Sequence, residues 1–198
     1  MARKYELKSR AARQEATRQR IVEAVIALHE EIGPARTSIS AIAERAGVER
    51  LTVYRHFSTE GEIFRACSAH FDELHPFPDL TRWGASDDPF ARLELGLTEL
   101  YRYFAETERM FAAAMRDAPS TPAMHETFMR YQDGFRAVFA MLLAGFDTAG
   151  IVLETVRLPI LLAIDFRTWQ IMVREQGMDI SNAVAYQLEI ARCAANGA

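Results

Sequence analysis

The chain has 198 residues, a formal net charge of −4 and 49% hydrophobic residues, a composition typical of a protein that folds around its own core. Its two cysteines, Cys67 and Cys193, lie far apart without metal-ligand spacing, which argues against a disulfide framework and a zinc site. No apolar run reaches the length of a membrane span, and no apolar secretion segment follows the basic N-terminus. We therefore expect a cytoplasmic protein that holds no metal ion and no cofactor.

Charge is distributed unevenly along the chain. Residues 1–60 contain 11 Lys and Arg against 8 Asp and Glu, and this balance of +3 leaves −7 for the remaining residues. The basic excess is strongest in residues 1–20, which suits a polyanionic partner such as nucleic acid. Residues 1–13 have no apolar period, so we expect them to be mobile until bound, and we interpret them either as a basic arm that reaches into a DNA minor groove or as a solvated tail.

A first long helix is predicted from Thr17 to Ile32. Its apolar residues recur at steps of three and four until Gly33 and Pro34, which end it. His29 lies on this helix, and no second ligand residue stands at a chelating spacing from it. We expect the helix to support the segment that follows, with His29 as a packing or surface residue.

Residues 37–57 have the pattern of a helix-turn-helix. Apolar residues at helical spacing give a first short helix one buried face, and Ser38 or the residue before it can cap this helix. Gly47 ends it, because glycine adopts the left-handed backbone that a tight turn needs at little cost. A second helix over about residues 49–56 can bury Val53 while its other side chains face outward.

These outward side chains suit a DNA duplex. A helix in the major groove needs hydrogen-bond donors for base edges near its N-terminus and polar groups for the flanking phosphates. The segment offers both, and the predicted DNA-binding residues are Thr37, Ser38, Arg50, Leu51, Thr52, Tyr54, Arg55 and His56. The alternative is an ordinary helix pair in an all-α core, which would rarely leave such a polar surface beside a basic N-terminus. We therefore favour DNA binding.

The same segment resembles the TetR-type (tetracycline-repressor-like) transcriptional regulators of bacteria. Within about residues 17–64, the family pattern is carried by Gly33, Thr37, Ser38, Ile42, Ala43, Ala46, Gly47, Thr52, Tyr54, His56 and Phe57. The resemblance implies an all-α fold with an N-terminal three-helix DNA-binding domain and a C-terminal helical ligand-binding and dimerisation domain. It also implies a homodimer that binds double-stranded DNA and responds to a small-molecule effector. Glu60 departs from the pattern, since the family commonly has a phosphate-contacting Lys there, and Leu51 stands where a small residue is frequent.

The rest of the chain is predicted to be helical, with one substantial loop. The sequence Thr59–Glu62 has the form of a capping box, so a fourth helix starts at Gly61 or just before it. Residues 75–88 are interrupted by Pro and Gly, which no helix tolerates so densely, and they are predicted to form the loop. We place the DNA-binding domain at residues 1–60 and the regulatory domain at residues 61–198.

After the loop, one helix is predicted from Pro89 through Phe104, a shorter one around residues 110–115, and a long one from Pro122. The long helix carries a stripe of Phe, Tyr and Met residues that is by default core. An interior of flexible Met and flat rings can also leave a pocket for an apolar ligand, which the resemblance implies. The candidate ligand-binding residues are Phe104, Met110, Met115, His125, Phe128, Tyr131, Phe135, Asp165, Arg167 and Trp169.

Two C-terminal segments are predicted to form a dimer interface. Residues 151–173 are apolar on nearly every side, with Pro159 expected to kink or restart the helix, and residues 180–194 carry a second apolar stripe. A helix that is apolar all round has to be buried all round, which in so small a domain requires a partner subunit. The alternative is a fully interior helix in a monomer; the resemblance favours a four-helix dimer interface.

Known catalytic signatures such as the P-loop, GxSxG, HExxH and dinucleotide-binding glycine patterns do not occur, so we predict no enzyme activity and no catalytic residue. The predicted function is a ligand-responsive transcriptional regulator. It represses by binding a near-palindromic operator as a dimer and is released by a small apolar molecule. The alternatives are a ligand-independent DNA-binding protein and an all-α protein-interaction module.

Overall fold

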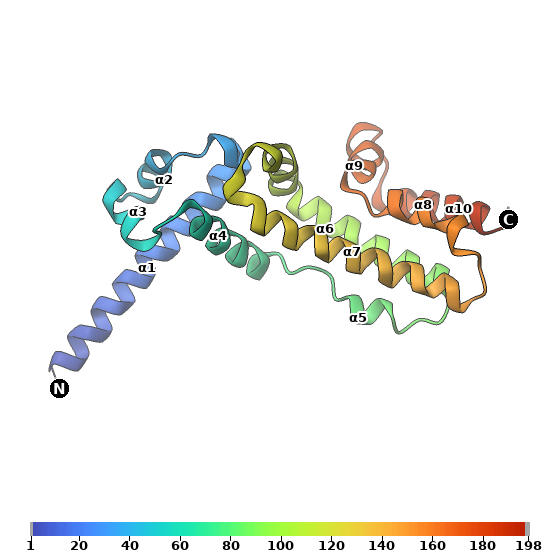
Figure 1. Cartoon of the computed structure of the whole chain (residues 1–198), viewed down its shortest axis with the longest axis horizontal. Coiled ribbons are helices and arrows are strands. Elements are labelled where there is room, and N and C mark those ends of the chain that lie inside the picture. Colours follow the sequence, from blue (N-terminus) through green and yellow to red (C-terminus); the bar gives the residue numbers. More distant parts are fainter. Residues whose placement is uncertain (1, 197–198) are drawn as a thin grey trace. The chain divides into compact units, whose positions relative to one another are not determined.

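The computed structural model describes residues 2–196, without the side chains of residues 2–9 and 148, and these residues form helices and no strand (Figure 1). The all-α fold class is confirmed. The chain divides into two compact units, each made of two chain segments: unit 1 comprises Met1–His75 and Glu108–Met129, and unit 2 comprises Pro76–Thr107 and Arg130–Ala198. None of the described helices is both long and apolar enough to cross a membrane.

The first segment of unit 1 contains, in chain order, α1 (Ala2–Glu31), the 3-10 helix η1 (Pro34–Arg36), α2 (Ile39–Ala46), α3 (Arg50–His56) and α4 (Glu60–Leu74). Contrary to expectation, the basic arm predicted at residues 1–13 is helical from Ala2 onward, and Met1 lies outside the described residues. No Gly or Pro interrupts this stretch, and Ala, Arg, Lys, Glu and Gln are strong helix formers. Local propensity therefore extends α1 by about four turns beyond its apolar pattern.

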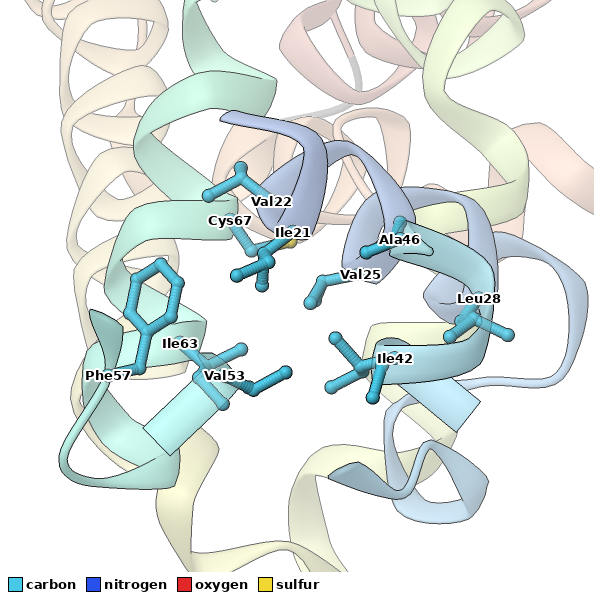
Figure 2. Packing of buried hydrophobic residues seen from close by; sticks show 12 residues of the cluster. Ile21, Val22, Val25, Leu28, Ile42, Ala46, Val53, Phe57, Ile63 and Cys67 are labelled. Carbon is cyan, nitrogen blue, oxygen red and sulfur yellow. The ribbon is translucent and has the colours of Figure 1, made fainter. Parts of the chain in front are cut away.

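One apolar cluster holds the helices of the first segment together (Figure 2). Figure 2 shows Val25 of α1, Ile42 of α2, Val53 of α3 and Ile63 of α4 pointing toward one another, and all four are buried. The cluster also contains Ile21, Val22, Ala24, Leu28, Ala43, Ala46, Phe57 and Cys67. Burying an aliphatic side chain of this size contributes about 1.5–3 kcal/mol. The cluster therefore gives the short helix α3 a stability that seven residues could not supply alone.

Helix α4 begins at Glu60, as the capping box predicts. The Thr59 Oγ1 accepts the Glu62 N–H at 3.2 Å, and the Glu62 carboxylate accepts the Ser58 N–H at 2.7 Å. The first bond satisfies a backbone donor that the first turn of a helix leaves unpaired, and the second satisfies the N–H of the residue before the cap.

The remaining elements are α5 (Leu80–Trp83), α6 (Pro89–Asp117), the 3-10 helices η2 (Ala118–Ser120) and η3 (Pro122–Met124), α7 (His125–Thr148), α8 (Leu153–Ala163), α9 (Phe166–Trp169), the π-helix η4 (Gln170–Glu175) and α10 (Ile180–Asn196). Helices α6 and α7 contribute residues to both units, and η2 and η3 join them within unit 1. On α7, Val138 and Leu142 of the predicted apolar stripe are fully buried, which confirms that this part of the stripe is core.

Two expectations about residues 75–117 are wrong. Helix α6 is continuous where two helices were predicted, because no Gly or Pro occurs between Gly96 and Pro119 to break it. The predicted loop contains α5, which is fixed by its tryptophan: Trp83 is fully buried, and its Nε1 donates to the Glu99 carboxylate at 2.7 Å. The Pro and Gly residues from which the loop was predicted give no sign of the contact between Trp83 and Glu99.

The apolar segment at residues 151–173 breaks at Asp165, although the break was expected at Pro159. Pro159 lies inside α8. The Asp165 carboxylate accepts the N–H groups of Arg167 at 2.8 Å and Thr168 at 3.1 Å, which makes it the N-cap of α9. The helical segment therefore restarts at Asp165 and not at Pro159, and the second predicted interface helix is α10.

Candidate nucleic-acid interface

A tight turn joins α2 to α3. Ser38 begins α2, since its Oγ accepts the Ala41 N–H at 3.2 Å. Gly47 ends α2 with a φ of 65°, a left-handed conformation that glycine adopts without a steric penalty. The Val48 N–H then donates to the Ala43 carbonyl at 2.9 Å, which closes the turn. The helix-turn-helix predicted from the sequence is thus present, with both helices close to their expected bounds.

Helix α3 has one buried and one open face. Val53 is fully buried and Phe57, directly after the helix, is 1% exposed. The opposite face presents Arg50, Leu51, Tyr54 and Arg55 to solvent, with Thr52 and His56 half-buried at its edge. Leu51 is 56% exposed and Tyr54 is 49% exposed, so α3 leaves large side chains uncovered beside two cations. Such a surface is typical of a helix that contacts a partner.

The two hydroxyl residues before α2 are engaged by local backbone. Thr37 is half-buried, and its Oγ1 donates to the Gly33 carbonyl at 2.9 Å, while Ser38 is the exposed cap described above. Glu60 is the exposed first residue of α4, where its carboxylate favours the positive end of the helix dipole. Because a carboxylate repels phosphate, the Glu60 side chain is unsuited to the DNA phosphate contact that a Lys commonly makes at this position in the family.

Arg18 ties α1 to the end of α3. Its guanidinium donates to the His56 carbonyl at 3.2 Å and lies 4.2 Å from the centre of the Phe57 ring. A cation near the last carbonyls of a helix and over an aromatic face is stabilising on both counts. In the sequence, Arg18 is only one of several basic residues in the first 20 positions, because nothing there signals a contact across 38 positions.

A buried histidine lies behind the helix-turn-helix, between α1 and α4. His29 is 3% exposed, stacks on Phe64 with ring centroids 5.2 Å apart, and places its Nδ1 3.6 Å from the Cys67 Sγ. Burial lowers the pKa of His29 to about 4, although the negative charge of Asp117 acts in the opposite direction. Burial also raises the pKa of Cys67 to about 12. Near pH 7 the pair is a neutral imidazole beside a thiol, which confirms His29 as a packing residue.

Three of the candidate ligand-binding residues meet in unit 2. The Phe104 ring lies 5.9 Å from that of Phe135, 5.8 Å from that of Trp169 and 5.3 Å from that of Phe166, which the sequence analysis missed. Trp169 is fully buried, and among the described residues its Nε1 has no hydrogen-bond partner. Leaving a buried donor unpaired costs about 1–3 kcal/mol. The aromatic cluster therefore contains one unsatisfied polar group.

The two charged candidates have other roles in unit 2. Asp165 caps α9, and Arg167 is exposed and pairs with Glu175 at 3.2 Å. Tyr131 is half-buried in unit 2, whereas Met110, Met115, His125 and Phe128 belong to the second segment of unit 1. Met115 is 43% exposed, so it lacks the enclosed position expected of a pocket residue.

Helices α8 and α10 pack against each other in unit 2 and still leave apolar side chains uncovered. Val156 and Ile160 of α8 are fully buried. On the same helix, Leu158, Leu161 and Leu162 are 59%, 49% and 50% exposed, and α10 adds Tyr186 and Ile190 to the exposed set. An exposed row of leucines is unusual on the surface of a monomeric protein.

A buried core shared by α1, α2, α3 and α4, a glycine turn and an outward second helix that begins with Arg50 make up a helix-turn-helix. Residues 21–67, from α1 into α4, match the family model described as bacterial regulatory proteins, tetR family. The similarity to this family therefore lies in the segment where the sequence pattern indicated it.

Comparisons with individual proteins agree with this assignment. The HTH-type transcriptional regulator TtgR of Pseudomonas putida is 40% identical over 73 residues, which are 36% of this chain and 33% of TtgR. The match thus spans about a third of that relative's length. A TetR-like transcriptional regulator from Rhodococcus sp. RHA1 superposes with a TM-score of 0.65 at 18% identity, covering 92% of this chain and 97% of that one. FadR from Bacillus subtilis, solved in complex with stearoyl-CoA, gives a TM-score of 0.59 at 17% identity, with 91% and 98% covered. The whole chain therefore has the TetR-type fold.

Proposed function

We propose that this chain is a ligand-responsive transcriptional repressor that binds a near-palindromic operator as a homodimer and is released by a small apolar molecule. DNA binding is assigned to residues 1–60, and effector binding and dimer formation to residues 61–198. The regulator acts in the cytoplasm and has no enzymatic activity. The names of the matching family and relatives, all of them regulators, support this assignment.

The open face of α3 carries the proposal. Arg50 begins the helix, where a side chain can reach base edges in the major groove, and Leu51 beside it can meet a thymine methyl group. Tyr54, Arg55 and His56 lie toward the end of the helix, where they suit phosphate contacts. Because Val53 and Phe57 are buried in the core, α3 is held in a fixed orientation, and its outward side chains face solvent before DNA binds.

A homodimer is supported by the exposed leucines of α8 and the uncovered side chains of α10. A second copy of the same surface would cover them in a two-fold arrangement. Two identical recognition helices related by a two-fold axis require an operator whose half-sites are also related by two-fold symmetry. The near-palindromic operator follows from this geometry.

An apolar effector is supported by the aromatic cluster of Phe104, Phe135, Phe166 and Trp169 in unit 2. Flat rings around a largely apolar interior accommodate an apolar molecule, and the unpaired Trp169 Nε1 could donate to an acceptor on it. FadR, which shares the fold, was solved with stearoyl-CoA, a molecule with a long apolar chain. The proposed effector class is therefore an apolar molecule that carries a hydrogen-bond acceptor.

Selection of bound fragments from the source genome by the purified protein tests the function directly. We expect enrichment of fragments that share a near-palindrome, with affinity that falls steeply as salt rises, because cations on the protein displace counterions from DNA. The Arg50→Ala variant should relax the sequence preference at one operator position. Failure to enrich any sequence, together with a salt-independent interaction with protein, would instead favour an all-α interaction module.

A further inference from the structure

A groove runs between the first half of α1 and the outer edge of α3. It has a volume of about 820 Å³. The side chains that line it include Arg10, Arg13 and Arg18 from α1 and Thr52, Arg55 and His56 from α3. Figure 1 shows that the first part of α1 extends past the helices that pack on its second half. The groove therefore continues the surface of α3 along α1, away from the helix-turn-helix core.

The groove is strongly basic. Four arginines line it, and Glu15 is the one acidic side chain among the described residues that do so. Gln14 and Thr52 add neutral hydrogen-bonding groups. Phosphate oxygens accept charge-assisted bonds from guanidinium groups as well as neutral bonds from amides and hydroxyls. A phosphate backbone is thus the partner that this set of side chains fits.

Arg18 fixes the two walls of the groove relative to each other. Its bond to the His56 carbonyl and its position over the Phe57 ring hold α1 against the end of α3. Arg10 and Arg13 precede Arg18 on the same helix, so their placement follows from that anchor. The basic surface exists before DNA binds, which reduces the ordering cost of a contact.

The helical state of α1 also decides how it can approach DNA. An α-helix with its side chains is about 10–12 Å wide, whereas the minor groove of B-DNA is about 6 Å wide. The first half of α1 therefore cannot enter an undistorted minor groove as an extended arm would. It can lie along the outside of the duplex, where phosphates are within reach of Arg10 and Arg13.

We propose that this groove holds the sugar-phosphate backbone of the operator beside the major groove that α3 enters. The inference rests on the proposed function and adds to it a second contact surface that carries no base readout. The first half of α1 then lengthens the contacted DNA on the outer side of each half-site. Arg10 and Arg13 contribute to affinity and to its salt dependence, but not to sequence preference.

The test compares the double variant Arg10→Ala/Arg13→Ala with Arg20→Ala on operator DNA carrying long flanks. Arg20 is a matched control, because it is an exposed arginine of the same helix that does not line the groove. We expect the double variant to bind about tenfold more weakly, with a salt slope smaller by about 0.9 for each lost phosphate contact, or nearly two per subunit. Base preferences at the half-sites should stay unchanged, and hydroxyl-radical protection outside them should disappear.

Arg20→Ala should keep the affinity, the slope and the flanking protection of the unaltered protein. The groove assignment is overturned if the double variant retains all three while Arg50→Ala still relaxes the preference at one operator position; the proposed function then stands alone. A wild-type protein that selects no DNA sequence overturns the proposed function and this inference together. Equal thermal unfolding of the variants by circular dichroism establishes that the exposed substitutions leave the fold intact.

Discussion

At the scale of single residues, Arg50 and Tyr54 share the open face of α3 but are expected to contribute differently. Arg50 begins the helix and should read a base, so Arg50→Ala should cost about 1–3 kcal/mol of binding free energy and relax the preference at one operator position. Tyr54 should contact phosphate, so Tyr54→Phe should weaken all sequences alike. Titration of operators with single-base changes measures both effects. Equal losses on specific and random DNA for Arg50→Ala would refute its assignment to base readout.

His29 should make the stability of the protein depend on pH between about 4 and 6.5. Burial depresses its pKa in the folded state, so the unfolded chain binds a proton first as pH falls, and stability is lost over this interval. The loss should be on the order of 3 kcal/mol. Urea unfolding of the wild type at pH 7 and pH 4.5 measures it.

In His29→Gln the pH-dependent loss over this interval should shrink, whatever the variant's stability at pH 7. The exposed His125 provides the control, and His125→Gln should behave as the wild type. The ion pair with Arg116 holds the pKa of Asp117 below its usual range. Asp117 therefore contributes little to the change in stability within this pH interval. An undiminished pH dependence in His29→Gln would show that other groups are responsible.

At the scale of elements, the attachment of α3 to α1 should depend on Arg18. Arg18→Ala removes a hydrogen bond that a charged guanidinium donates and a cation–π contact, so it should free the end of α3 and cost about 1–3 kcal/mol of stability. Amide hydrogen exchange should accelerate in α3, and operator affinity should fall. Arg20→Ala removes the same charge without these contacts and should leave exchange unchanged. Protection of α3 that is equal in both variants would contradict the role of this anchor.

The elements that the sequence predicted well are those with local signals. The bounds of α2, α3 and α4 follow from the Ser38 cap, the Gly47 turn and the Thr59 capping box, each of which acts within a few residues. The start of α1 was missed because the apolar pattern covers only the part of the helix that packs against other helices. Helix propensity extends further toward the N-terminus. Helix α5 was missed because the buried contact of Trp83 with Glu99 spans 16 positions, which no local pattern reveals.

In the candidate site, too, the sequence predicted features that depend on local signals and missed those that depend on distant contacts. The outward face of α3 follows from helical periodicity around Val53, and the structure leaves its side chains exposed as expected. Arg18 and Phe166 were missed, since each gains its importance from distant partners. Asp165 and Arg167 were chosen as polar groups in an apolar segment, yet the structure uses Asp165 as a helix cap and Arg167 in a surface ion pair.

At the scale of the whole molecule, the exposed leucines of α8 should form the dimer interface. Leu158→Glu/Leu162→Glu places unpaired charges in that interface, at a cost of several kcal/mol each, against the roughly 8 kcal/mol that a micromolar dimer requires. The variant should be monomeric by light scattering at micromolar concentration and should bind the operator poorly. Leu51→Glu alters an equally exposed leucine of α3 and should remain dimeric. A monomeric wild-type protein would rule out the dimer.

An effector should lower operator affinity by changing the spacing of the two recognition helices. These helices have to lie about 34–36 Å apart to enter successive major grooves. A molecule that favours the non-binding state a hundredfold, or by about 2.7 kcal/mol, suffices to release DNA. A thermal-shift screen of apolar compounds, including long-chain acyl molecules, should find one that stabilises the protein and weakens operator binding.

The Trp169→Phe variant separates specific from nonspecific binding in that screen. It keeps one aromatic ring and removes the unpaired N–H together with the rest of the indole, so it should bind an acceptor-bearing effector more weakly while Arg50→Ala binds it normally. The absence of any stabilising compound, combined with a solidly filled aromatic cluster in unit 2, would leave a ligand-independent DNA-binding protein.

The discontinuous composition of unit 1 limits how this regulator can be recombined with others. The end of α6 and the start of α7 belong to the same unit as the helix-turn-helix, and they are bound to it: the Asp117 carboxylate accepts the Ala35 N–H at 3.0 Å, and Arg65 pairs with Glu126 at 2.9 Å. A chimera made with a single crossover after α4 would separate these partners. Transplanting DNA specificity intact needs junctions after His75, before Glu108 and after Met129, so the exchangeable module is defined in space and not by one stretch of the gene.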